Sequence, residues 1–387
     1  MCNPQPHACG KTGRRQFMGE KHLVSEQFLD ALEFRGLSRR DFLKFCGVTS
    51  ALLGLSELYT PQVASAIEKA SKRPPVVWLN FASDSGCTES LIKATYPNAA
   101  DLILDILSVD YNETIMAAAG KQAEEVLAKS LKDGGYILII EGGVPTKKGH
   151  GMIAGKEMID ILKDFSGPAA AIIAVGSCAT FGGVPAANPN PSRIVGVSEA
   201  LKKVGANKAV INLDLCPVNV EYLVGVIVNY LLLGSLPELD SFGRPKMFYG
   251  RTIHDNCERR AHFDAGRFVE QFGSKEETMG YCLYKMGCKG PMTYSECPKI
   301  RYNDKINWCI GAGAPCIGCA EQGWPDKFAG FYERLPGIKL PGFGGIETTA
   351  DKIGAVAAAA TAAGIAIHAV ASALSGRTKD REKEEGK

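Results

Sequence analysis

Cysteine is the residue type with the clearest chemistry in this 387-residue chain, which has thirteen of them. Four lie within twenty-three residues, among glycines and prolines, and the last two form a CxxC pair: Cys297, Cys309, Cys316 and Cys319. Thiolates at such spacing bind zinc or iron–sulfur clusters. The spacing therefore predicts a metal or cluster site in this part of the chain.

A second group of candidate ligands precedes the first. His254 and Cys257 form an HxxC pair, and Cys282 and Cys288 follow them. Imidazole replaces thiolate at some iron–sulfur centres, so the histidine belongs with these cysteines as a candidate ligand.

Three more cysteines lie earlier, each just after an apolar run typical of a strand: Cys87, Cys178 and Cys216. In an open parallel sheet, sites form outside the carboxyl ends of the strands. We therefore expect these three thiols to converge, although they are far apart in sequence. The alternative for each one is a small buried hydrophobic residue.

Asp84 stands three residues before Cys87, where a CxxC pair would have its first thiol. A carboxylate binds iron, although it is a harder donor than thiolate. The alternative is a turn residue that caps the helix expected to follow. Ten cysteines after residue 67, together with Asp84 and His254, make twelve ligands, enough for three cubanes of four.

The elements that position these residues follow from the apolar pattern. Five strand-like runs are separated by helical stretches such as 113–133 and 155–165; the runs are PPVVWLNF, DLILDILSVDY, YILIIEG, AAAIIAVGSC and KAVINLDLC. Continuous apolar strands between helices predict an α/β fold, a flavodoxin-like doubly wound parallel sheet, over residues 67–239. Residues 240–345 have few long apolar runs and seven of the ten later cysteines, so bound metal or disulfides must organise them.

The first 66 residues predict an export signal. Twin arginines, Arg39 and Arg40, precede a moderately apolar stretch that ends in a small-residue pattern, which predicts cleavage after Ala66. The alternative is a chance arginine pair before an amphipathic helix. Twin-arginine export carries folded proteins, so the later cysteines are better interpreted as metal ligands than as disulfides.

The other end of the chain predicts a membrane anchor over residues 350–376. Residues 353–374 carry no formal charge and are long enough to span a bilayer, with a buried helix as the alternative. The charged tail, 377–387, is then cytoplasmic by the positive-inside rule, which places the body on the periplasmic face of the inner membrane. The net charge of +2 and the absence of a basic stripe among aromatic residues predict no nucleic-acid partner.

Several motifs occur in an order that resembles the small subunit of membrane-anchored respiratory NiFe hydrogenases over essentially the whole chain: WLNFASDSGCTES, VGSCATFGG, LCPVN, YGRTIHDNCERRAHFDAGRF, CLYKMGCKGPMTYSECP and NWCIGAGAPCIGC. The resemblance implies an electron-transfer subunit with three iron–sulfur clusters. It implies that a partner large subunit holds the nickel and splits H2. The electrons would leave near His254 for a membrane cytochrome b or a ferredoxin-like partner and the quinone pool.

By the same resemblance the ligands divide into three sets. The proximal 4Fe–4S cluster would take Asp84, Cys87, Cys178 and Cys216; the distal 4Fe–4S cluster His254, Cys257, Cys282 and Cys288; and the medial cluster Cys297, Cys309, Cys316 and Cys319.

Two positions depart from the family pattern. Asp84 aligns where the family usually has a cysteine, and Cys309 where many relatives have proline and a medial 3Fe–4S cluster. We therefore predict a medial 4Fe–4S cluster, with Cys309 as a buried bystander the alternative. Two other functions fit the sequence less well: an exported binding domain stabilised by disulfides and zinc, and the iron–sulfur subunit of another redox complex.

Overall fold

The structure is a computed structural model, and it falls into two compact units, Met1–Ser71 and Lys72–Lys387. Each unit is described by itself. The residues that the structure describes are 38–52, 56–69, 75–94, 108–233, 236–303, 305–328, 330–334 and 350–384, together with the single positions 24 and 29.

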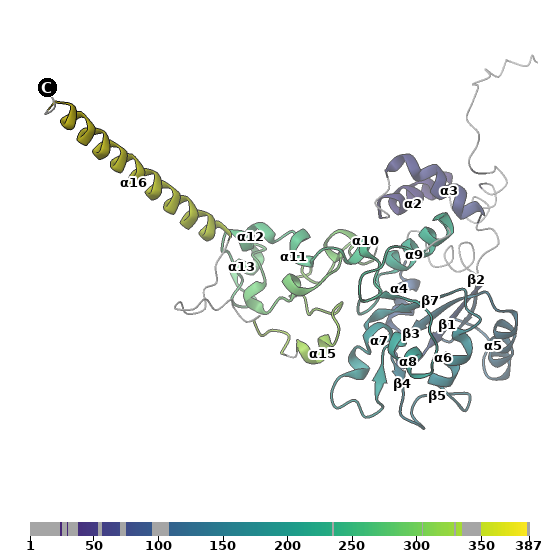
Figure 1. The fold of residues 1–387 in the computed structure, drawn as a ribbon. Coiled ribbons are helices and arrows are strands. Elements are labelled where there is room, and N and C mark those ends of the chain that lie inside the picture. The colour runs from purple at the N-terminus through teal and green to yellow at the C-terminus, as the bar shows by residue number, and fades with distance from the viewer. Residues whose placement is uncertain are drawn as a thin grey trace, which may run out of the picture. The chain divides into compact units, whose positions relative to one another are not determined.

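The first unit contains two helices that pack on each other, α2 (Arg39–Leu52) and α3 (Thr60–Lys69), joined through the short 3-10 helix η1 (Glu57–Tyr59) (Figure 1). The two arginines of the predicted signal are the exposed first residues of α2. The predicted cleavage point lies inside α3.

The second unit is built on a five-stranded sheet in which every pair is parallel. The strand order is β2-β1-β3-β7-β9, the order of flavodoxin-like folds. This confirms the predicted fold class. The strands are β1 (Pro75–Asn80), β2 (Ser108–Asn112), β3 (Ile137–Glu141), β7 (Ala171–Val175) and β9 (Val210–Leu213). Residues 101–107, which we expected to begin β2, lie outside the described residues.

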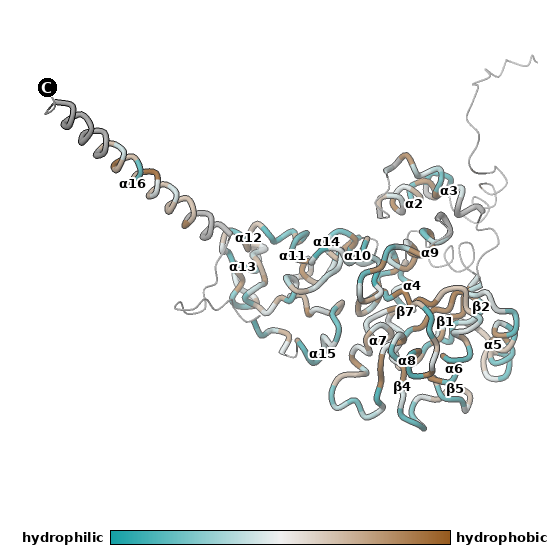
Figure 2. Tube along the Cα trace, in the orientation of Figure 1, coloured by the Kyte–Doolittle hydropathy of each residue, from teal (hydrophilic) through white to brown (hydrophobic). Residues whose placement is uncertain are grey.

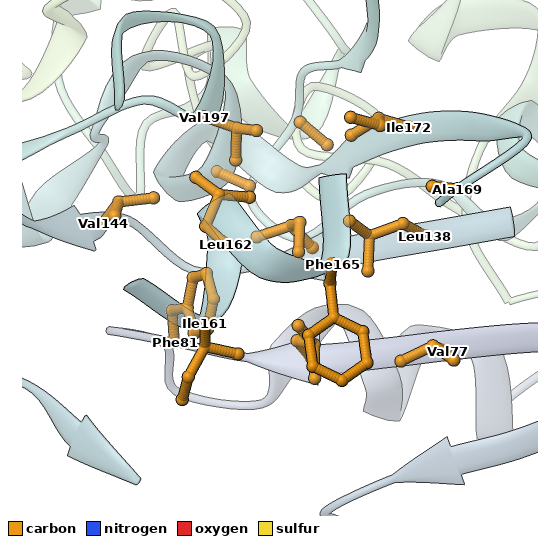
Figure 3. Close-up of a cluster of buried hydrophobic side chains, with 14 of the residues drawn as sticks. Val77, Phe81, Leu138, Val144, Ile161, Leu162, Phe165, Ala169, Ile172 and Val197 are labelled. Carbon is orange, nitrogen blue, oxygen red and sulfur yellow. The ribbon is translucent and has the colours of Figure 1, made fainter. Parts of the chain in front are cut away.

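The core explains why these runs form central strands. Alternate residues of β1 and β3, such as Val77 and Leu138, face helices on one side of the sheet, and the residues between them, such as Trp78 and Ile139, face the other side. Both sets are buried, as is usual for a parallel sheet covered on two faces. Figure 3 shows side chains of helix α6 beside those of the strands, and Figure 2 shows hydrophobic residues along β1 and β7.

The helices of this domain are α4 (Gly86–Ile92), α5 (Lys121–Asp133), α6 (Met158–Ser166), α7 (Gly176–Phe181), α8 (Val197–Lys203) and α9 (Val220–Leu233). Two predicted helices were too long. Residues 113–120 are irregular, and the helix begins only after Gly120, its N-cap residue, where φ is 56°. Residues 156–157 form strand β6, which pairs with β5 (Met152–Ile153) in a small hairpin. A second short pair joins β4 (Val144–Pro145) to β8 (Ile194–Val195).

After residue 240 the described chain has only short helices and isolated β-bridges before its last helix. The short helices are α10 (Lys246–Tyr249), α11 (Ile253–Asn256), α12 (Arg260–Asp264), α13 (Lys275–Thr278), η4 (Tyr284–Met286), η5 (Gly290–Met292), α14 (Cys297–Ile300) and α15 (Trp324–Lys327). Helices of one turn are marginal on their own, so side-chain packing and ligands must hold this segment.

Hydrogen bonds join this irregular segment to the segments that follow the strands. The Tyr302 hydroxyl donates to the carbonyl oxygen of Pro217 at 2.9 Å, and the Tyr222 hydroxyl lies 2.9 Å from that of Ser295. Tyr222 also stacks on Phe248, with ring centroids 4.3 Å apart. The irregular segment therefore packs beside the residues that follow β9.

The last described element is α16 (Ala350–Glu384). Within it Val356–Ala373 is exposed and has a mean hydropathy of 1.7. By length and composition it is the one helix of the described chain that is long and apolar enough to cross a bilayer.

Candidate metal centres

The first group of candidate ligands lies in the segments that follow three strands. Cys87 is the second residue of α4, after β1. Cys178 lies inside α7 rather than at the end of β7, which stops at Val175. Cys216 follows the last residue of β9 by three positions and is exposed.

The charges of these three thiols act on one another. Burial and the neighbouring carboxylate of Glu141 raise the pKa of Cys87 well above its usual value, and Cys178 and Cys216 raise it further. Burial and then the nearby Cys216 raise the pKa of Cys178 to about 12. The three thiols are therefore near enough for their charges to act on one another.

Two glycines make room for the sulfur atoms of this group. A Cβ at Gly176, where φ is +82°, would lie 2.5 Å from the Sγ of Cys87. A Cβ at Gly183, where φ is +51°, would lie 2.9 Å from the Sγ of Cys178. Any other residue at these positions would collide with a candidate ligand, so glycine is required at both.

Asp84 has the properties of both interpretations proposed for it. Its Oδ1 accepts a hydrogen bond of 2.9 Å from the backbone N–H of Gly86, the first residue of α4. The side chain is exposed, and its charge raises the pKa of Cys178 and Cys216. The carboxylate therefore stabilises a local turn through Oδ1 and also lies beside the thiols. Its other oxygen, Oδ2, accepts no hydrogen bond from the described residues.

Glu141 is a residue of this site that the sequence analysis missed. It ends β3, is 1% exposed, and its oxygens accept hydrogen bonds from the backbone N–H groups of Cys87 (2.9 Å) and Thr88 (3.1 Å). It also accepts from Trp78 Nε1 at 3.0 Å and from the hydroxyls of Thr88 at 2.6 Å and Ser83 at 3.1 Å. A glutamate directly after four apolar strand residues was the signal in the sequence.

The second group also comes together. Cys282 and Cys288 are buried, and burial followed by its two neighbours, Cys288 and Cys257, raises the pKa of Cys282 to about 12. Cys257 is the C-cap residue directly after helix α11, and a capping box formed by Thr252 and Asp255 begins that helix. That box fixes the orientation of the HxxC segment.

His254 lies on the same short helix, with its backbone nitrogen 3.9 Å from a Cβ built at Gly290. The Cβ at Gly290 would also lie 3.4 Å from the Sγ of Cys288. Burial, and then the positive charge of Arg260, lowers the pKa of His254, which favours the neutral imidazole that binds metals. Its ring contacts Phe263 edge to face, with centroids 4.5 Å apart.

All four cysteines of the third group lie close together. Burial raises the pKa of Cys319 well above its usual value, and Cys297, Cys316 and Cys309 raise it further. Cys297 and Cys316 are buried, whereas Cys309 is exposed, and its assignment as a ligand stays a prediction. The side chain of neighbouring Trp308 is buried, and its Nε1 has no partner among the described residues.

The three groups are arranged in sequence. The charge of Cys216, in the first group, acts on Cys319 of the third, and the Ser177 hydroxyl donates to the carbonyl oxygen of Cys319 at 2.5 Å. At the other end, Cys288 of the second group is close enough to Cys316 to raise its pKa, after burial. The third group therefore lies between the other two.

The chemistry of these side chains fits iron–sulfur clusters. None of the eleven described cysteines is joined in a disulfide. Burial and mutual repulsion oppose the thiolate form, and bound iron would supply the positive charge that makes several adjacent thiolates stable. No three described His, Cys, Asp or Glu side chains are arranged to hold a single metal ion. A cubane does not need such an arrangement, because each ligand binds a different iron.

Two family models match the chain. One, which describes the C-terminal region of the small subunit of NiFe/NiFeSe hydrogenases, covers residues 249–332. The other, described as "NADH ubiquinone oxidoreductase, 20 Kd subunit", covers residues 85–230. Together they span the sheet domain after β1 and most of the irregular segment.

Relatives match over most of their length. The periplasmic [NiFe] hydrogenase small subunit 1 of Nitratidesulfovibrio vulgaris is 48% identical over 307 residues, 79% of this chain and 96% of that one. The quinone-reactive Ni/Fe-hydrogenase small chain of Wolinella succinogenes is 44% identical over 361 residues, 91% of this chain and 99% of that one. A structure of the [NiFeSe]-hydrogenase of Dm. baculatum superposes with a TM-score of 0.62 at 32% identity, covering 68% of this chain and 99% of that one. This chain therefore belongs to the family of NiFe hydrogenase small subunits.

Proposed function

We propose that this protein conducts electrons away from the nickel site through three iron–sulfur clusters. As in the family, the active site belongs to the partner large subunit, and the small subunit supplies electron transfer. When bound, the clusters accept and release single electrons. The chain itself provides ligands, spacing and burial, which set the reduction potentials.

The observation that carries this proposal is the order of the three ligand groups, in which the third group neighbours both of the others. The first group would hold the proximal cluster with Asp84, Cys87, Cys178 and Cys216. The third group would hold the medial cluster with Cys297, Cys309, Cys316 and Cys319. The second would hold the distal cluster with His254, Cys257, Cys282 and Cys288. Neighbouring groups interact through Cys216 and Cys319 at one end, and through Cys288 with Cys316 and Cys309 at the other.

The position of Cys309 supports four thiolate ligands at the medial site and hence a 4Fe–4S cluster. Its thiol is close enough to Cys297 and Cys319 to raise the pKa of both.

We further propose that the subunit works at the periplasmic face of the inner membrane and delivers electrons to a membrane cytochrome b, or to a ferredoxin-like protein, and from there to quinone. The twin arginines that begin α2 and the exposed apolar segment of α16 support this topology. The names of the periplasmic and quinone-reactive relatives agree with it.

Iron and acid-labile sulfide analysis of the purified heterodimer tests the central proposal. We expect about twelve iron atoms on this chain, four for each cubane, and a brown protein. About eleven iron atoms would indicate a medial 3Fe–4S cluster. A colourless protein with stoichiometric zinc would contradict the proposal and support the zinc-stabilised binding domain instead.

A further inference from the structure

Lys289 is a buried cation between two of the proposed clusters. It directly follows Cys288, a proposed distal ligand, and is 3% exposed. Lysine is almost never so deeply buried unless its charge has a use or a partner. None of the roles described so far includes it.

The backbone of Lys289 connects the distal and medial ligands. Its N–H donates to the carbonyl oxygen of Cys316 at 2.8 Å. Its own carbonyl oxygen accepts from the Thr293 hydroxyl at 2.8 Å, and that hydroxyl lies 3.8 Å from the Sγ of Cys316. A Cβ built at Gly318, inside the medial CxxC pair, would lie 3.4 Å from the Cβ of Lys289.

The side chain is fixed by the backbone at its far end. The Nζ of Lys289 donates to the carbonyl oxygen of Glu333 at 2.5 Å. Lys289 directly follows Cys288, and its N–H donates to the carbonyl oxygen of Cys316. The cation therefore lies between ligands of the proposed distal and medial groups.

We propose that Lys289 raises the reduction potentials of the medial and distal clusters together and so favours the electron step from the proximal to the medial cluster. This rests on the proposed function, because it assigns a role within the same relay. A fixed positive charge stabilises the reduced, more negative state of a neighbouring cluster. Because Lys289 lies at the junction, both clusters benefit, and the proximal cluster, beyond the medial group, does not.

Potentiometric titration of the purified heterodimer, followed by EPR, tests this in Lys289→Met, Lys289→Gln and Lys289→Arg. At one solution potential we expect the two neutral variants to lower the reduced-to-oxidised ratio of the medial and distal clusters about tenfold, equal to about 59 mV for one electron. Lys289→Arg retains the charge and should restore the native ratio. The proximal cluster should not change in any variant.

Lys299→Met is the matched control. Lys299 lies two residues after Cys297, but its side chain is 54% exposed and pairs with Glu296 at 3.0 Å. Solvent and the ion pair screen its charge, so all three potentials should stay as in the native protein.

Each outcome decides the inference. Unchanged medial and distal potentials in a neutral variant that retains its iron would overturn it. If both neutral variants lose their clusters and Lys289→Arg keeps them, the lysine is needed for assembly and the tuning role is also overturned. A native protein without iron would instead refute the proposed function itself.

Discussion

Asp84 makes a structural hydrogen bond in a turn and also lies beside the proposed proximal ligands. One oxygen accepts the N–H of Gly86 and fixes the turn before α4, and the carboxylate also lies beside the proposed proximal thiols. A structural aspartate and a proposed iron ligand thus occupy one position. Substitutions that separate these roles reveal which of them the site needs.

For Asp84→Asn we expect an altered proximal EPR signal and potential with an unchanged melting temperature. The amide oxygen still accepts from Gly86, but it is neutral and a weaker iron donor. Asp84→Ala should change the cluster and also lower the free energy of unfolding by about 1 kcal/mol, because the turn loses its hydrogen bond. Native proximal EPR signals in both variants would show that Asp84 is no ligand.

On the proposed ligand sets, Cys309 sets the type of medial cluster. In Cys309→Pro we expect a 3Fe–4S cluster, with about eleven iron atoms on the chain in place of about twelve. An oxidised 3Fe–4S cluster is paramagnetic and an oxidised 4Fe–4S cluster of this kind is not, so EPR of the oxidised heterodimer detects the change. An iron content and oxidised spectrum equal to those of the native protein would contradict the assignment.

At the scale of elements, the end of β3 and the start of α4 are joined by Glu141. Its carboxylate accepts two backbone N–H groups of the helix and Trp78 Nε1 of the neighbouring strand. Negative charge is favourable at a helix N-terminus. This buried acid therefore fixes the segment that carries Cys87.

We expect Glu141→Gln to lower the free energy of unfolding of the heterodimer by about 1–3 kcal/mol, measured by urea denaturation. The new amide group places a donor where backbone donors already point, which leaves buried groups without partners. Glu89→Gln is the control on the same helix, since Glu89 is 61% exposed and pairs with Lys93 at the surface. An equal loss in both variants would exclude a special role for Glu141.

Glu113, which follows β2, predicts a pH dependence. Burial raises its pKa from 4.5 to about 7, and the Tyr111 hydroxyl donates to it at 3.3 Å. The folded state holds the proton more tightly than the unfolded chain. Its contribution to stability is therefore complete below pH 4.5 and is lost as pH rises towards about 7.

The expected loss of unfolding free energy is about 1 kcal/mol. This is less than the full pKa shift of Glu113 implies, because its side chain is partly exposed. Urea midpoints at about pH 5 and about pH 8 measure it. In Glu113→Gln this part of the difference should disappear, whereas a difference as large as in the native protein would assign the pH dependence to other groups.

Much of the element pattern was predictable, because continuous apolar runs such as that of β3 are typical of central parallel strands. The convergence of Cys87, Cys178 and Cys216 followed from the rule on strand ends. The start of α5 was not predictable from composition. The alanines before Gly120 favour a helix, but the positive φ of Gly120 separates them from the helix that begins at Lys121. Glu141 and Lys289 were missed because a sequence does not show that a charge is buried.

At the scale of the whole molecule, the sheet domain and the irregular segment form one unit, and α16 follows after residues that the structure does not describe. A chain that ends at Thr349 should keep its iron content and leave the membrane fraction for the soluble periplasmic fraction. Fractionation after carbonate washing measures this. Retention of the shortened heterodimer on the membrane would place the anchor elsewhere.

The wide spacing of the proximal ligands has a consequence for biosynthesis. Cys178 follows Cys87 by 91 residues (178 − 87), and Cys216 follows it by a further 38 (216 − 178), so the site exists only once the sheet has formed. The last proposed medial ligand, Cys319, lies 253 residues after Ala66 (319 − 66), so the proposed leader is synthesised long before the ligand sets are complete. A secretion pathway that threads nascent chains would take the chain before a cluster could be inserted in the cytoplasm. This order of ligands is therefore consistent with the proposed twin-arginine export of a folded, metal-loaded protein.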